Sequence, residues 1–97
     1  MEERQKLIIL YDFYSDLLKE NQRKNFEDYY FNNLSLGEIS ENEKVSRNAI
    51  HKSIKKVEKE LENYEDKLKL YKKSKELELL ADTIKDEELK RKIKEIL

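Results

Sequence analysis

Apolar residues recur every three or four positions along most of the chain, which is the spacing of amphipathic α-helices. This period predicts helices over residues 2–18, 20–32, 36–42 and from Ser46 to about Tyr71. The remainder, 74–97, carries two more apolar rows that separate near Asp86, a residue type that caps helices. The chain is therefore predicted to be all-α.

The helix after Ser46 has the strictest pattern, because its apolar residues alternate spacings of four and three over three heptads. The seam consists of Ile50, Ile54, Val57, Leu61, Tyr64, Leu68 and Tyr71. A helix of about 26 residues is roughly 39 Å long, so its second half projects beyond a three-helix domain and needs a partner. We predict a homodimer, and packing within one chain is the alternative. The predicted interface is Val57, Leu61, Tyr64, Leu68 and Tyr71.

The third and fourth predicted helices form a helix-turn-helix. Ser35 followed by Glu38 is a capping box, and Ser46 is a second N-cap a few residues after the short third helix. Two helices joined by such a short turn, the second one basic, are typical of nucleic-acid-binding proteins. We therefore predict a single domain over 1–97, with a helix-turn-helix core at 1–59 and a helical dimerisation extension at 60–97.

Positive charge is concentrated in the second of these two helices. Residues 44–59 contain six Lys and Arg and one Glu, a net charge of +5 in a chain of net charge -1. Such clustering is typical of a polyanion-binding surface or, alternatively, of a solvated helix face. Ile39, Val45, Ile50 and Ile54 are predicted to join the two helices. The nucleic-acid-binding candidates are then Ser46, Arg47, Asn48, His51, Lys52, Lys55, Lys56 and Lys59. Arg and Asn can read purine edges, and Lys favours phosphates.

Composition excludes several other classes of protein. The chain has no Cys, Pro or Trp, one Gly and one His. A disulfide scaffold, a thiolate metal site, a P-loop and a glycine-rich dinucleotide turn therefore lack the residues they need. We expect no metal, no cofactor and no enzymatic activity. The longest aliphatic run is four residues, too short for a membrane span or a signal peptide, so we expect a cytoplasmic protein.

Several segments also resemble known proteins when taken in order. They are Asp28-Tyr-Tyr-Phe-Asn-Asn-Leu-Ser-Leu-Gly-Glu-Ile39, Val45-Ser-Arg-Asn-Ala-Ile50 and Glu60-Leu-Glu-Asn-Tyr-Glu65. Over residues 4–72 the chain resembles region 4 of sigma-70-type factors and, more closely, the YlxM-like family of small bacterial helix-turn-helix proteins. The resemblance implies an accessory or regulatory role in the signal recognition particle pathway. The candidate nucleic-acid partner is the particle's RNA or duplex DNA, and the particle's GTPase is a further candidate partner.

Three positions depart from the usual helix-turn-helix pattern. Ser40, Glu43 and Lys44 stand where such motifs have Ala, an apolar residue and Gly. A turn glycine adopts a positive φ freely, whereas another residue there costs roughly 1 kcal/mol. The sequence thus predicts a looser turn.

Three functions are compatible with these features. The first is an RNA-binding accessory protein of the signal recognition particle, with lysines on phosphates. The second is a sequence-specific transcriptional regulator that inserts Ser46–Lys55 into the major groove of duplex DNA. The third is a protein-interaction adaptor that recruits its partner through the heptad seam.

Overall fold

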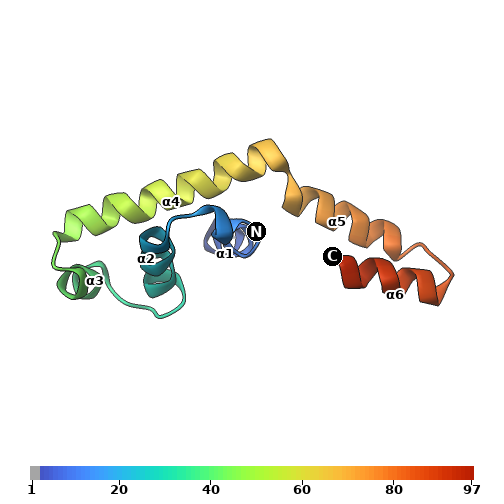
Figure 1. Ribbon diagram of the computed structural model, residues 1–97, viewed down its shortest axis with the longest axis horizontal. Coiled ribbons are helices and arrows are strands. Elements are labelled where there is room, and N and C mark those ends of the chain that lie inside the picture. Colours follow the sequence, from blue (N-terminus) through green and yellow to red (C-terminus); the bar gives the residue numbers. More distant parts are fainter. Residues whose placement is uncertain (1–2) are drawn as a thin grey trace.

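The computed structural model describes residues 3–97, which form six α-helices and one 3-10 turn and contain no β-strand. The elements are α1 (Glu3–Tyr14), η1 (Ser15–Leu17), α2 (Glu20–Tyr30), α3 (Leu36–Glu43), α4 (Arg47–Leu68), α5 (Leu70–Ala81) and α6 (Glu87–Ile96). The molecule is elongated, about 56 × 24 × 24 Å, with α4 lying along α1, α2 and α3 and with α5 and α6 at one end (Figure 1). The predicted all-α fold is confirmed. None of the helices described is long and apolar enough to cross a membrane.

The first two helices are shorter than predicted. The helix expected over 2–18 ends at Tyr14, and a 3-10 turn leads to Leu18, whose backbone is extended. Glu2 lies outside the described residues. The second helix ends at Tyr30, and Asn33 adopts a left-handed conformation with φ 54°, as suits an Asn-Asn turn.

The core lies where α1 and α2 cover α4. The phenol ring of Tyr11 stacks on Phe26, which stacks in turn on Tyr30, with ring centroids 4.4 and 4.3 Å apart. The other apolar residues buried around this stack are Leu7, Leu10, Tyr14, Leu18, Ile39, Ile50, Ile54, Val57 and Leu61. One apolar core therefore joins α1, α2, α3 and α4.

The long helix ends at Leu68, earlier than the heptad seam predicts. Lys69 adopts a left-handed conformation, with φ 55° and ψ 32°, and α5 starts directly after it. The predicted continuous helix to Tyr71 is therefore wrong.

The side chains of Tyr14, at the end of α1, and of Glu65, near the end of α4, stabilise this break. The Tyr14 hydroxyl donates to Glu65 Oε1 (2.6 Å) and accepts from the backbone N–H of Leu70 (3.1 Å). The Glu65 carboxylate accepts the next two backbone N–H groups, those of Tyr71 and Lys72. The first N–H groups of α5 are thus satisfied without a residue that caps locally.

Most of the predicted dimer interface is used within the chain. Val57 and Leu61 are completely buried in the core, so their assignment to an interface between chains is wrong. Tyr64 and Tyr71 are half-buried against aromatic residues of α1. Leu68 is exposed. The alternative, packing within one chain, thus holds for the first part of the seam.

Candidate nucleic-acid interface

Two hydroxyl caps fix where the helices of the helix-turn-helix begin. Ser35 accepts the backbone N–H of Glu38 at 3.1 Å, and the Glu38 carboxylate accepts that of Ser35 at 3.0 Å. Ser46 accepts the backbone N–H of Ala49 at 3.0 Å. Both predicted caps are confirmed, and the second sets the start of the basic helix at Arg47.

The turn between α3 and α4 has the strained residue that the sequence predicts. Lys44 is left-handed, with φ 58° and ψ 41°, and the following N–H, that of Val45, donates to the carbonyl of Ser40 at 3.1 Å. A non-glycine residue here costs roughly 1 kcal/mol. Val45 is exposed in the turn, so its predicted role in joining the helices is wrong, while Ile39, Ile50 and Ile54 are buried as predicted.

A buried amide takes the place of the missing apolar contact at Glu43. Asn25 of α2 is almost fully buried, and its amide lies between α3 and α4. In the orientation that satisfies both neighbours, its nitrogen donates to Glu43 Oε1 at 2.7 Å and its oxygen accepts from Ser53 Oγ at 3.2 Å. The apolar pattern of the sequence does not predict a role for Asn25. The polar Glu43 at an expected apolar position was the one signal that a buried polar partner is needed.

The outer face of α4 carries an exposed basic stripe. Ile50, Ile54, Val57 and Leu61 face the core at spacings of 4, 3 and 4. The same spacings on the opposite side of the helix define the basic stripe, Asn48, Lys52, Lys55 and Lys59, all exposed. The basic stripe is about 17 Å long at 1.5 Å per residue.

The other candidate residues flank the basic stripe. Arg47 and His51, one turn apart, lie toward α3, and Lys56 lies on the other side. Arg47, Asn48 and His51 line a shallow open hollow of about 320 Å³ together with Leu36 at the start of α3. Ser46 is also exposed, but its hydroxyl oxygen caps α4. All eight predicted residues therefore lie at the surface, between Ser46 and Lys59.

Charge is not balanced across this surface. Lys55 pairs with Glu58 at 3.2 Å, and Glu58 also accepts a hydrogen bond from the buried Tyr30 hydroxyl. Within residues 3–97, no ion pair holds Lys52, Lys56 or Lys59. On this surface, the lysines without an ion pair thus outnumber the one lysine, Lys55, that has one.

The first helix of the motif has the opposite charge. α3 contains Glu38, Glu41 and Glu43 and no Lys or Arg. The hydrogen bonds from Ser35 lower the pKa of Glu38, so this carboxylate is ionised at neutral pH. The described residues contain no group of three or more His, Asp or Glu that could hold a metal ion.

Comparison with known families decides what this helix-turn-helix belongs to. A family model described as "Putative helix-turn-helix protein, YlxM / p13 like" matches residues 1–97. The chain belongs to this family. The resemblance to the YlxM-like family is thereby confirmed, and the family description suggests nucleic-acid binding.

Bacterial relatives support the same assignment. A UPF0122 protein of Malacoplasma penetrans is 56% identical over 64 residues, 66% of this chain and 60% of that protein. One from Caldanaerobacter subterraneus subsp. tengcongensis is 46% identical over 80 residues, 82% of this chain and 68% of its own length. One from Bacillus thuringiensis is 44% identical over 85 residues, 88% and 77% of the two chains.

Proposed function

We propose that this YlxM/p13-like protein is a non-enzymatic accessory or regulatory protein of the signal recognition particle pathway, whose basic stripe contacts phosphates of the particle's RNA. The observation that carries this proposal is the basic stripe itself, with exposed lysines aligned on the side of α4 opposite the core. Aligned lysines attract a phosphate backbone whatever its sequence. The pathway rests on the family resemblance, and the particle's GTPase is proposed as a second partner.

The charge of α3 favours RNA over duplex DNA. When a helix-turn-helix docks on DNA, its first helix crosses the phosphate backbone. Here that helix carries three glutamates and no basic residue, so it repels phosphates. Lys56 and Lys59 also lie two to three turns into α4, beyond the N-terminal residues that contact bases in such docking. RNA offers phosphates without requiring that an α-helix enter its narrow major groove.

A sequence-specific DNA-binding regulator is the second candidate, because of the hollow at the start of α4. Arg47 and Asn48 are exposed beside Leu36, and both residue types pair with purine edges in the major groove. A protein with this function inserts Ser46–Lys55 into the major groove of DNA. Its α3 must then lie against the DNA phosphates in spite of the negative charge of this helix.

Fluorescence anisotropy separates the two candidates. Labelled signal recognition particle RNA and a length-matched DNA duplex are each titrated with the protein at two salt concentrations. We expect tighter, salt-sensitive binding to the RNA, and we expect Arg47→Ala to weaken it only modestly and without regard to sequence. A preference for one DNA sequence that Arg47→Ala relaxes by about 1–3 kcal/mol at a single base pair would establish the regulator instead. Binding to neither nucleic acid would favour the third function, that of a protein-interaction adaptor.

A further inference from the structure

The helix α6 packs mainly on α5, and α5 also contacts α1 and α4 at its start, through Leu70 and Tyr71. α6 lies alongside α5, at the end of the molecule away from the core (Figure 1). Asp82, just after α5, joins them, since its carboxylate lies 2.6 Å from Lys94 Nζ and 3.9 Å from Lys90 Nζ. In residues 70–97 only Ala81 is buried. This α5–α6 hairpin therefore has almost no interior of its own.

Four aliphatic side chains share one face of the hairpin. Successive residues turn by 100° around a helix. Measured around the α5 axis, Leu77 and Leu80 thus lie roughly 140–160° from Asp82. Measured around the α6 axis, Leu89 and Ile96 lie at the same angles from Lys94. Because Asp82 and Lys94 meet on one side, these four side chains, the hairpin row, lie together on the other. They are 47%, 62%, 48% and 85% exposed in that order.

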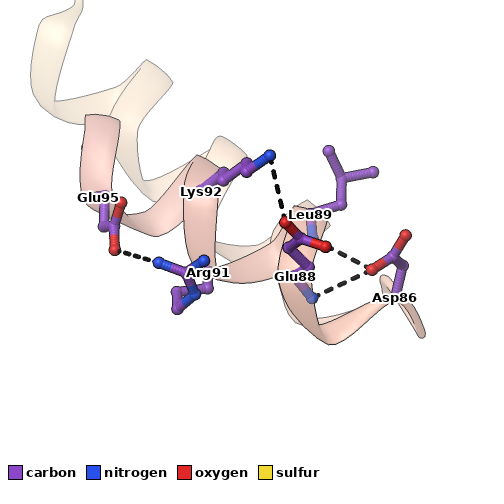
Figure 2. A network of polar contacts seen from close by, with 6 residues as sticks. All are labelled: Asp86, Glu88, Leu89, Arg91, Lys92 and Glu95. Atoms are coloured by element: carbon purple, nitrogen blue, oxygen red, sulfur yellow. Dashed lines mark hydrogen bonds and ion pairs between the residues drawn. The ribbon is translucent and has the colours of Figure 1, made fainter.

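Interactions within α6 are too weak to hold it without a partner. Figure 2 shows the Asp86 carboxylate accepting the backbone N–H groups of Glu88 and Leu89, beside the ion pairs Lys92–Glu88 and Arg91–Glu95. Exposed pairs of this kind contribute about 0.3–0.5 kcal/mol each. α5 has 12 residues and α6 has 10, lengths at which an isolated helix is marginal in water. The hairpin needs its apolar row covered.

We propose that the hairpin row is covered by the same row of a second copy of this chain, so that two hairpins form a four-helix bundle. Two observations favour an identical partner. Residues 70–97 contain eight basic and seven acidic side chains, interleaved, so a strongly acidic or basic partner gains little from this surface. A two-fold axis also places matching apolar rows against each other, which is the self-complementarity of an isologous interface.

The exposed area indicates how strong this dimer is. The hairpin rows of two copies offer roughly 600 Å² of apolar surface, at about 130 Å² for a whole leucine side chain. Homodimer interfaces are about 65% apolar, so the whole interface is roughly 1,000 Å², the lower limit for a specific complex. The dimer is therefore expected to dissociate in the micromolar range. It does not use Val57 or Leu61, and it stands independently of any nucleic-acid binding.

Sedimentation equilibrium of the full chain between about 2 and 200 μM tests the proposal. We expect a monomer–dimer equilibrium, and we expect Leu80→Lys to raise the dimer dissociation constant at least tenfold. The matched control is Leu79→Lys, because Leu79 is 68% exposed on the same helix but points away from α6 and the hairpin row. That variant should dimerise like the wild type.

A second variant covers the case in which Leu80→Lys disturbs the hairpin itself. Ile96→Glu changes the last turn of α6, where it cannot affect the core, and it should also abolish the dimer while leaving the circular dichroism spectrum nearly unchanged. A wild-type chain that stays monomeric throughout would overturn the proposal. So would a dimer that Leu79→Lys weakens as much as Leu80→Lys, or one that survives Ile96→Glu unchanged.

Discussion

At the scale of single residues, two of the three unusual side chains in the turn of the helix-turn-helix, Ser40 and Glu43, have hydrogen-bond partners that compensate for them. The Ser40 hydroxyl donates to the carbonyl of Gly37 at 2.8 Å, so it is satisfied although nearly buried. Glu43 accepts from the buried Asn25 amide. Lys44 has no such partner, and it keeps the strain of a left-handed backbone.

Replacing Lys44 by Gly should therefore stabilise the protein. We expect Lys44→Gly to raise the free energy of unfolding by about 0.5–1 kcal/mol, since glycine adopts this conformation without strain but loses more entropy on folding. Urea unfolding followed by circular dichroism measures the change. Lys44→Ala is the control, because it removes the same charge and keeps the Cβ atom, so it should not stabilise. An equal gain from both variants would show that charge, and not backbone strain, limits the turn.

At the scale of helices, three phenol–carboxylate hydrogen bonds tie the core together. Tyr11 on α1 donates to Glu27 on α2, and Tyr14 on α1 donates to Glu65 on α4. Tyr30 on α2 donates to Glu58 on α4, completing the set. Burial raises the pKa of Tyr11, Tyr14 and Tyr30 above the ordinary value near 10, and the adjacent carboxylates raise it further.

These tyrosines make the fold sensitive to alkali. In the unfolded chain phenols ionise near pH 10, whereas in the folded chain they stay neutral to higher pH. The stability they contribute is thus fully present below pH 10 and is lost as the pH rises toward their folded pKa values. The urea midpoint should fall steeply between pH 10 and 12, and Tyr30→Phe should make that fall shallower while costing about 1 kcal/mol at pH 7. A urea midpoint unchanged up to pH 12 would contradict the claim that ionisation of these phenols destabilises the fold.

Helix starts were predictable from the sequence because their causes are local. Ser35, Ser46 and Asp86 each accept a backbone N–H two or three residues ahead, so a short stretch of sequence contains the whole cap. The break at Lys69 has no such local signal, since Leu68 and Tyr71 continue the heptad. It depends on Tyr14, 56 residues from the Leu70 N–H that its hydroxyl accepts. Contacts between distant elements decide such features, and spacing alone cannot reveal them.

At the scale of the whole molecule, the chain separates a basic surface from an apolar one. The basic stripe lies on residues 48–59 of α4, on the side away from the core, and the hairpin row lies on α5 and α6 at the other end of the molecule. The charges that cluster in 44–59 led to eight candidate residues that are all exposed, and their contact with nucleic acid stays a prediction. The sequence misplaced the second surface, because the regular seam hid that Val57 and Leu61 are needed by α1 and α2. The packing of the core decides which apolar residues stay exposed and can contact a partner.

The salt dependence of RNA binding shows whether the basic stripe contacts phosphates. Removing three phosphate contacts should lower the slope of log affinity against log salt by about 2, since each contact contributes roughly 0.7 on single strands. We predict this loss for Lys52→Ala/Lys55→Ala/Lys59→Ala. The control Lys72→Ala/Lys73→Ala/Lys85→Ala removes the same charge from exposed positions beyond α4 and should keep the wild-type slope. Equal slopes for both triple variants would mean that the basic stripe does not bind the RNA.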